Sequence, residues 1–153
     1  MDFDASGYLL PHNILTSDVF TLEQVFVLGL SESTTRRALF ERYLQYNDTL
    51  RQLIPAGFRQ WVDGSFISRK LNPRDIDFLT FVDYQLYENH ESAFDELRRI
   101  RLDRSFGIDG YFVKVYPNTH RLYNDYQSDL IEWQYQFGTT RKHESKGFLE
   151  ITI

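Results

Sequence analysis

The chain has 153 residues, of which 42% are hydrophobic and 16% aromatic, so it is long enough to bury the core of one domain. It has no cysteine, which excludes a disulfide framework and a thiolate metal site and favours a reducing, cytoplasmic compartment. The net charge of -5 argues against dense nonspecific binding of nucleic acid. No apolar run approaches about 20 residues, which argues against a membrane span, and the acidic N-terminus argues against a secretory signal.

The first third of the chain predicts an arm followed by helices. Residues 1–20 have no clear periodicity and predict an irregular arm that lies over the core. Residues 21–30 keep one apolar face and are compatible with a short helix. From residue 33 to about residue 54, leucine and aromatic side chains recur at helical spacing, and Pro55 ends the run. We therefore expect one long amphipathic helix before the central part of the chain.

The most informative stretch is Trp61–Val82, in which Asp75 and Asp77 stand at the start of an apolar run. Side chains alternate along a strand, so the two aspartates are expected on one face of it. Because both faces of the run read as apolar, this strand is expected to be buried, where neighbouring carboxylates are unfavourable unless they are neutralised. Mg²⁺ neutralises them and takes carboxylate and phosphate oxygens as ligands. The pattern predicts a two-metal site for phosphoryl transfer.

The Gly64-Ser65 turn, which precedes the two aspartates, predicts a phosphate-binding loop. Gly64 lets the backbone approach a phosphate closely, and Ser65 offers a hydroxyl and a backbone N–H. Lys70 and Arg74 lie in the connecting loop. They either neutralise phosphate charge or are simply solvated, as most basic side chains in loops are.

A third carboxylate is expected from a neighbouring strand. Residues 91–102 predict a helix, and residues 106–116 are rich in β-branched and aromatic residues, as in a strand. A strand-helix-strand crossover would place this second strand beside the first. Gly107 and Gly110 bracket Asp109, so either the backbone bends there or another segment passes close by. Asp109 is the candidate for a third metal ligand, the alternative being a turn cap before the strand.

The C-terminal part predicts a helix, a loop and a strand. Residues 122–137 carry an aromatic stripe at helical spacing, which is typical of core packing rather than of base stacking. Residues 146–153 alternate and predict an edge strand. The basic residues of the intervening loop either are solvated or steer a nucleotide or an RNA end toward the site. These residues are Arg141, Lys142, His143 and Lys146.

The Gly64-Ser65 turn, the Asp75-Ile76-Asp77 pair nine residues later and Asp109 resemble the signature of the nucleotidyltransferase superfamily with a DNA polymerase β type of palm. More closely, the chain resembles a small prokaryotic family of nucleotidyltransferase-like proteins over nearly its whole length. The segments that carry this resemblance are Gly7–Pro11, a long helix, Val62–Phe66, Lys70, Pro73–Asp77, Trp133, Phe137-Gly138, Arg141 and Lys146–Ile151.

The resemblance implies one α+β domain over residues 1–153, a minimal nucleotidyltransferase fold whose mixed sheet is flanked by helices. It also implies that Gly64 and Ser65 hold a nucleoside triphosphate. Lys70 and Arg74 are candidates to assist them. Asp75, Asp77 and Asp109 would hold Mg²⁺ or Mn²⁺. Minimal nucleotidyltransferases often act as partners of toxins or in phage defence, so the resemblance implies a toxin-antitoxin or antiviral setting and a partner toxin or defence protein.

Two functions of different classes follow. The first is a magnesium-dependent enzyme that transfers a nucleoside monophosphate from a nucleoside triphosphate to a hydroxyl of a protein or RNA acceptor. The second is a catalytically silent module of the same fold that binds a partner protein. The Asp75 and Asp77 pair counts against the second, because a module without catalysis has no reason to keep two crowded anions in an apolar strand. The small size of the chain counts for it, since little sequence is left for an acceptor site.

Overall fold

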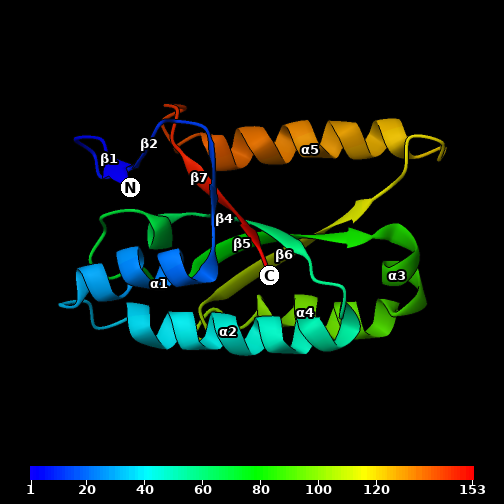
Figure 1. Cartoon of the computed structure of the whole chain (residues 1–153), viewed down its shortest axis with the longest axis horizontal. Helices are drawn as coiled ribbons and strands as arrows, with labels where there is room; N and C mark the ends of the chain where they lie inside the picture. The colour runs from blue at the N-terminus through cyan, green and yellow to red at the C-terminus, as the bar shows by residue number, and fades with distance from the viewer.

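A computed structural model describes residues 1–153 as an α+β fold in which a mixed five-stranded sheet lies between helices (Figure 1). The strand order is β3-β7-β4-β5-β6. β4 runs antiparallel to both β5 and β7, whereas β5 is parallel to β6 and β3 is parallel to β7. The strands of this sheet are β3 (Ile14–Ser17), β4 (Arg59–Asp63), β5 (Ile76–Asp83), β6 (Ile108–Val115) and β7 (Phe148–Thr152).

Helices cover both faces of the sheet. α5 lies on one face, and α1, α2 and α4 lie on the other (Figure 1). No helix is both long enough and apolar enough to cross a membrane. The helices are α1 (Val19–Phe26), α2 (Arg36–Leu53), α3 (Tyr84–Asn89), α4 (Glu91–Ile100) and α5 (Tyr123–Gly138), with short 3₁₀ helices at Leu28–Leu30 and Ser65–Ile67.

The central strand β5 is buried on both faces, as its sequence predicted. On one face, the ring of Phe78 lies edge-on to Tyr43 and Tyr46 of α2, with centroids 5.3 and 5.1 Å away. On the other face, Phe81 packs edge-on against Trp61 of β4 at 5.0 Å. Edge-to-face aromatic pairs stabilise the fold beyond the effect of burying their apolar area, so this cluster holds the strand and the long helix together.

The two long helices confirm the predictions from their periodicity. α2 buries Leu39, Tyr43 and Leu50 against the sheet. In α5, Phe137 is buried and its ring lies edge-on to Phe148 of β7, with centroids 5.9 Å apart. Trp133 contacts both Phe137 and Tyr111 of β6 in the same way. The aromatic stripe of α5 is therefore part of the core.

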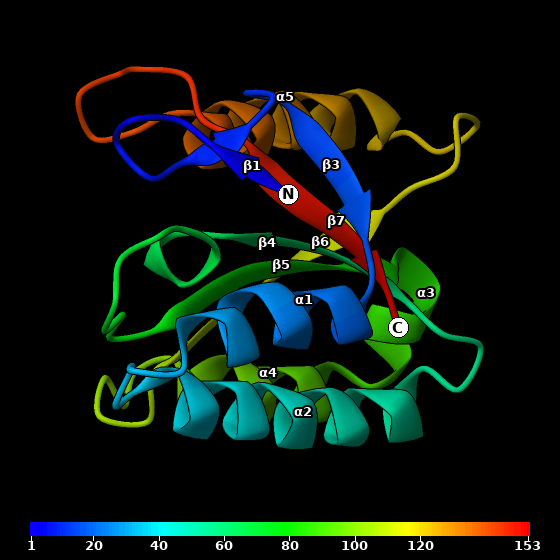
Figure 2. The ribbon, with the colours of Figure 1, turned by 60° about the vertical axis from the view of Figure 1, so that its left-hand side comes forward.

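The prediction of an irregular arm over residues 1–20 is wrong for much of its length. β1 (Asp2–Phe3) and β2 (Leu9–Leu10) form a small antiparallel pair, and β3 joins the main sheet beside β7 (Figure 2). β7 is therefore an inner strand and not the predicted edge strand, because β3 takes up its outer hydrogen-bonding groups. α3, which directly follows β5, was not predicted.

Candidate active site

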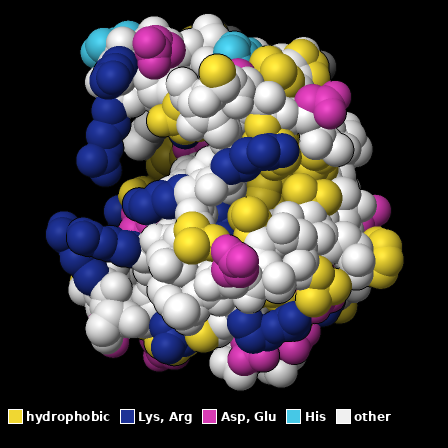
Figure 3. Space-filling view, turned by 90° about the vertical axis from the view of Figure 1, so that its left-hand side faces the viewer, with side chains coloured by type: hydrophobic (Ala, Val, Ile, Leu, Met, Phe, Trp, Pro, Cys, Tyr) yellow, Lys and Arg dark blue, Asp and Glu magenta, His cyan; other side chains and the backbone are white.

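One cleft of about 2000 Å³ opens at the end of the sheet where β4 ends and β5 and β6 begin. Its walls come from the N-terminal arm, the loop between β4 and β5, the start of β6 and the loop between α5 and β7. Figure 3 shows this face of the molecule, with Lys and Arg side chains around the hollow. All seven residues predicted for the site line the cleft: Gly64, Ser65, Lys70, Arg74, Asp75, Asp77 and Asp109.

Three aspartates stand side by side across the floor of the cleft. Asp63 of β4 is opposite Asp77 of β5, and Asp77 is opposite Asp109 of β6. Residues directly opposite each other on neighbouring strands point to the same face of a sheet. The predicted crossover between β5 and β6 thus brings Asp109 beside Asp77, and Asp109 lies in the strand, so it does not cap a turn before it.

Asp75 lies just before the strand, which begins at Ile76, so the expectation that Asp75 and Asp77 share one face of a strand is wrong for Asp75. It still lies near Asp77. Burial, and after it the neighbouring carboxylates of Asp75, Asp63 and Asp109, together raise the pKa of Asp77 to about 7. The carboxyl groups are therefore crowded enough to disfavour ionisation of the central one.

Only glycine fits at position 64, because the backbone there lies against the side chain of Asp77. Its φ of +80° is in the region that L side chains rarely adopt, and a Cβ atom placed on it would lie 1.8 Å from Oδ2 of Asp77. Ser65 follows as the first residue of a 3₁₀ turn. The Gly-Ser turn is thus folded directly against the carboxylate row.

Arg36, which the sequence analysis missed, holds the loop after Gly64 in place. Its guanidinium group extends from the first turn of α2, and the residue is only 1% exposed. It has no acidic partner. Burial lowers the pKa of Arg36 to about 10, so it is still protonated at neutral pH. Its N–H groups donate to the backbone carbonyls of Phe26, Ser65, Phe66, Ser68, Lys70 and Leu71.

Lys146 differs from its prediction as part of a solvated or steering basic loop. It is 9% exposed, and its ammonium group donates to the carboxylate of Asp63. Burial raises the pKa of Asp63, and the charge of Lys146 and its hydrogen bond oppose this rise. Asp63 is thus compensated by a cation of the protein, unlike Asp77, whose side chain accepts no hydrogen bond. Arg141 and Lys142 of the same loop are exposed and line the cleft.

Asp109 is bound by groups of the protein itself. Arg101, just after α4, donates from Nε to Oδ1 of Asp109 at 3.0 Å, and the hydroxyl of Tyr111 donates to Oδ2 at 3.2 Å. The guanidinium also stacks on the ring of Tyr111, 3.9 Å from its centroid. No three acidic or histidine side chains are arranged to hold one metal ion together in this conformation. The metal role of Asp109 therefore stays a prediction and requires that Arg101 move away.

The fold and the cleft define an α+β protein in which a row of carboxylates faces a glycine turn and basic side chains from the surrounding loops. Residues 1–152 match the model of a family described as a family of unknown function (DUF6932), and the chain belongs to this family. No curated protein and no solved structure matches the chain.

Proposed function

We propose that this protein is a metal-dependent nucleotidyltransferase with a minimal, polymerase β-like fold, which transfers a nucleoside monophosphate from a nucleoside triphosphate to a hydroxyl of a protein or RNA acceptor. One observation carries the proposal. Gly64 is folded so closely against Asp77 that no side chain fits between them, and Asp77 is in register with Asp109. A phosphate held by the Gly-Ser turn would therefore lie next to the carboxylates.

The donor set supports a hard divalent cation. Mg²⁺ is typically bound by one or two carboxylates together with substrate phosphates, and Asp75 and Asp77 provide the two carboxylates. Both line the same cleft as the turn. A bound Mg²⁺ or Mn²⁺ would supply positive charge to the attacking and leaving oxygens of the displacement.

The residues of the chain take the remaining roles. Ser65 and the backbone N–H groups of its turn bind the phosphates, and Lys70 and Arg74 reduce their negative charge. The acceptor oxygen attacks the α-phosphorus as the bond to pyrophosphate breaks, and pyrophosphate leaves with the electron pair. Once Arg101 has released it, Asp109 would bind a second metal ion and help to remove the proton of the acceptor hydroxyl.

A second candidate function is a catalytically silent module of this fold that binds a partner protein. The contact between Arg101 and Asp109 favours this module, because the guanidinium neutralises the charge of Asp109, as a bound metal ion would. The variant Arg101→Gln separates the two. If the site binds metal, the variant requires less Mn²⁺ than the wild type for half of the maximal thermal stabilisation, since competition for Asp109 is removed. A silent module shows no stabilisation by Mn²⁺ in either protein. Arg98→Gln, on the exposed side of α4, is the matched control.

The decisive experiment is incubation with α-labelled nucleoside triphosphates, one at a time with Mg²⁺, against total cellular RNA and lysate protein. The wild type is expected to transfer label, and Asp77→Asn is expected to transfer none. The labelled species identifies the donor nucleotide and the class of acceptor together. No transfer by the wild type, combined with no stabilisation by Mg²⁺ and any nucleotide, contradicts the proposal.

A further inference from the structure

The charge of the protein is distributed unevenly between the cleft and the rest of the surface. Of 17 Lys and Arg residues in the chain, eight line the cleft, but only six of the 22 Asp and Glu residues do. The cleft therefore has more basic than acidic residues, although the chain as a whole has a net charge of -5. A local excess of positive charge in an acidic protein favours a negatively charged ligand at this cleft.

Six of the eight basic residues have no acidic partner and can bind such a ligand, although the guanidinium of Arg69 also lies over the ring of Phe3. Arg101 and Lys146 are paired with Asp109 and Asp63, whereas the others are exposed and form no ion pair or side-chain hydrogen bond. They come from three separate loops, so they surround the carboxylate floor on several sides. The six residues, called the basic rim below, are Arg69, Lys70, Arg74, Arg104, Arg141 and Lys142.

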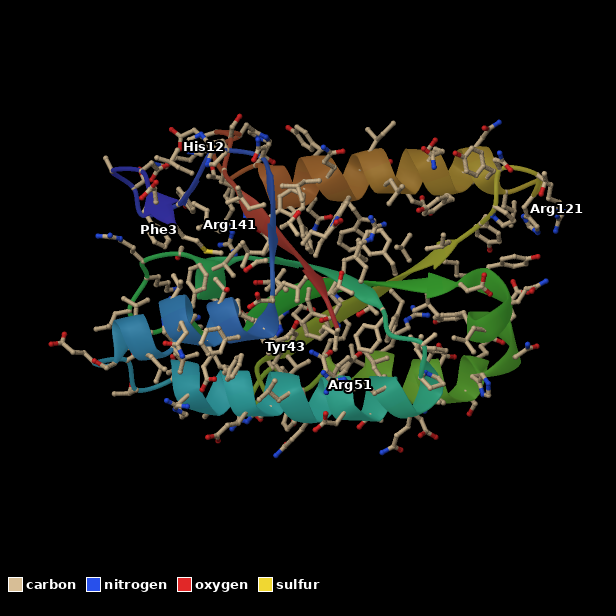
Figure 4. All side chains as sticks on the ribbon, viewed as in Figure 1. Phe3, His12, Tyr43, Arg51, Arg121 and Arg141 are labelled. Carbon is tan, nitrogen blue, oxygen red and sulfur yellow. The ribbon has the colours of Figure 1, made fainter.

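Part of the basic rim is remote in sequence from the Gly-Ser turn. Arg141 and Lys142 belong to the loop between α5 and β7, and Figure 4 shows Arg141 at the same end of the molecule as Phe3 and His12, opposite Arg121. The cleft is also large. Binding sites for small molecules usually have about 300–1,000 Å³, whereas this cleft has about 2000 Å³. A nucleotide at Ser65 leaves room for a second ligand beside Arg141 and Lys142.

We infer that this second ligand, the acceptor of the proposed reaction, is the end of a single-stranded nucleic acid. Its phosphates bind the basic rim, and its terminal hydroxyl reaches the carboxylate floor, which an end free of base pairing can enter. The inference rests on the proposed function. The inference agrees with the acidic net charge of the chain, which disfavours nonspecific binding along nucleic acid but allows binding in a local basic groove.

The chemistry of the walls favours nucleic acid over a protein acceptor. Only six of the 30 residues that line the cleft are hydrophobic. Protein interfaces depend on an apolar core with few charges, whereas nucleic-acid interfaces are polar and strongly positive. Four of the six rim residues are arginines, whose planar guanidinium groups match phosphate geometry better than lysine does.

The test is fluorescence anisotropy with short 3′-unpaired oligonucleotides labelled at the 5′ end, one of RNA and one of DNA, with Mg²⁺ and at several salt concentrations. The rim variant is Arg141→Gln/Lys142→Gln. The control is Arg99→Gln/Arg121→Gln, which removes the same charge from two exposed arginines outside the cleft. Equal urea midpoints of the two variants establish that both are folded. We expect the rim variant to bind on the order of tenfold more weakly than the control and to have a salt slope smaller by about 1.4.

Each outcome decides the inference. Weaker binding by the rim variant alone supports it, and the tighter of the two oligonucleotides identifies RNA or DNA. Equal loss in both variants indicates nonspecific attraction and overturns it. Thermal stabilisation of the wild type by Mg²⁺ and nucleotide without any oligonucleotide binding also overturns it, while leaving the proposed function with a protein acceptor. Rim-dependent oligonucleotide binding without nucleotide binding supports the nucleic-acid site and contradicts nucleotidyl transfer.

Discussion

Lys146 and Asp63 form a buried ion pair that joins the loop before β7 to the last residue of β4, with Nζ 2.8 Å from Oδ1 and 2.6 Å from Oδ2. The two residues are 83 positions apart in the chain. The contact fixes one wall of the cleft, since the same loop carries Arg141 and Lys142. It also leaves Asp77 as the carboxylate of the row that no basic side chain contacts directly.

Removing the cation is expected to destabilise the protein. Lys146→Met leaves Asp63 buried without a partner, which costs about 3–5 kcal/mol of unfolding free energy. The double variant Asp63→Asn/Lys146→Met is expected to recover most of this loss, because the unpaired charge is gone. Urea denaturation measures both, with Lys142→Met, an exposed residue of the same loop, as a control within about 0.5 kcal/mol of the wild type. A loss below about 1 kcal/mol for Lys146→Met contradicts the buried pair.

Arg36 is expected to be essential for the loop after Gly64. Arg36→Gln removes donors from six backbone carbonyls in a buried site, and we expect a loss of more than about 3 kcal/mol of unfolding free energy. Arg36→Lys keeps the charge but has only three donors, so an intermediate loss is expected.

The neighbouring residue provides the control for Arg36. Arg37 is exposed and pairs with Glu23 at the surface, where ion pairs contribute about 0–1 kcal/mol. Chemical denaturation of Arg36→Gln, Arg36→Lys and Arg37→Gln should rank them in this order, from least to most stable. Similar stabilities for Arg36→Gln and Arg37→Gln would show that the loop does not depend on the buried guanidinium.

Gly64→Ala is expected to disable the site. The added Cβ requires a strained φ and displaces the carboxylate of Asp77, so we expect a loss of about 1–3 kcal/mol and no stabilisation by Mg²⁺ and nucleotide. The wild type should gain about 2.7 kcal/mol when nucleotide is present at one hundred times its Kd. Gly138→Ala is the matched control, because its Cβ would lie 3.7 Å from the nearest atom, in Phe148. Thermal unfolding of the three proteins is measured with and without Mg²⁺ and nucleotide. Stabilisation of Gly64→Ala by the ligands to the same extent as the wild type would contradict the proposed contact between the turn and the ligand.

Ionisation of Asp77 is expected to reduce stability as the pH rises. Its pKa is about 7 in the folded protein and near 3.8 when unfolded, so between these values the unfolded state is ionised and the folded state is not. Stability is therefore lost from about pH 4 to pH 7 and the loss is constant above. Because one pKa unit corresponds to about 1.4 kcal/mol, Asp77→Asn should be more stable than the wild type by at most about 4 kcal/mol at pH 8.

The Asp77 prediction is measured by urea denaturation in metal-free buffer at a series of pH values. The advantage of Asp77→Asn should shrink toward zero near pH 4. Asp83→Asn is not a suitable control, because Asp83 caps α3 through the N–H groups of Gln85 and Leu86. Asp129, exposed on α5, is the better site for a matched Asp129→Asn variant. A difference in unfolding free energy between Asp77→Asn and the wild type that does not change with pH would contradict the raised pKa of Asp77.

Elements with a clear period were predictable, because the period reflects which side chains face the core. β5 was predicted from an apolar run, and α2 and α5 were predicted from apolar residues at helical spacing. β3 was not predicted, because none of its four residues is fully buried and its pairing partner, β7, lies at the other end of the chain. The same pairing makes β7 an inner strand, which no local pattern of residues 146–153 indicates.

The sequence alone determined the candidate groups of the site: the Gly64-Ser65 turn, the aspartates at positions 75, 77 and 109, and the strands that present two of them. These follow from local patterns, because apolar runs predict the strands and the strand-helix-strand order places Asp109 beside Asp77. Only the tertiary structure decided that Arg36 holds the turn, that Lys146 neutralises Asp63 and that Arg101 binds Asp109. Each of these contacts depends on a long, charged side chain that reaches another part of the fold, and such a reach leaves no periodic signal in the sequence.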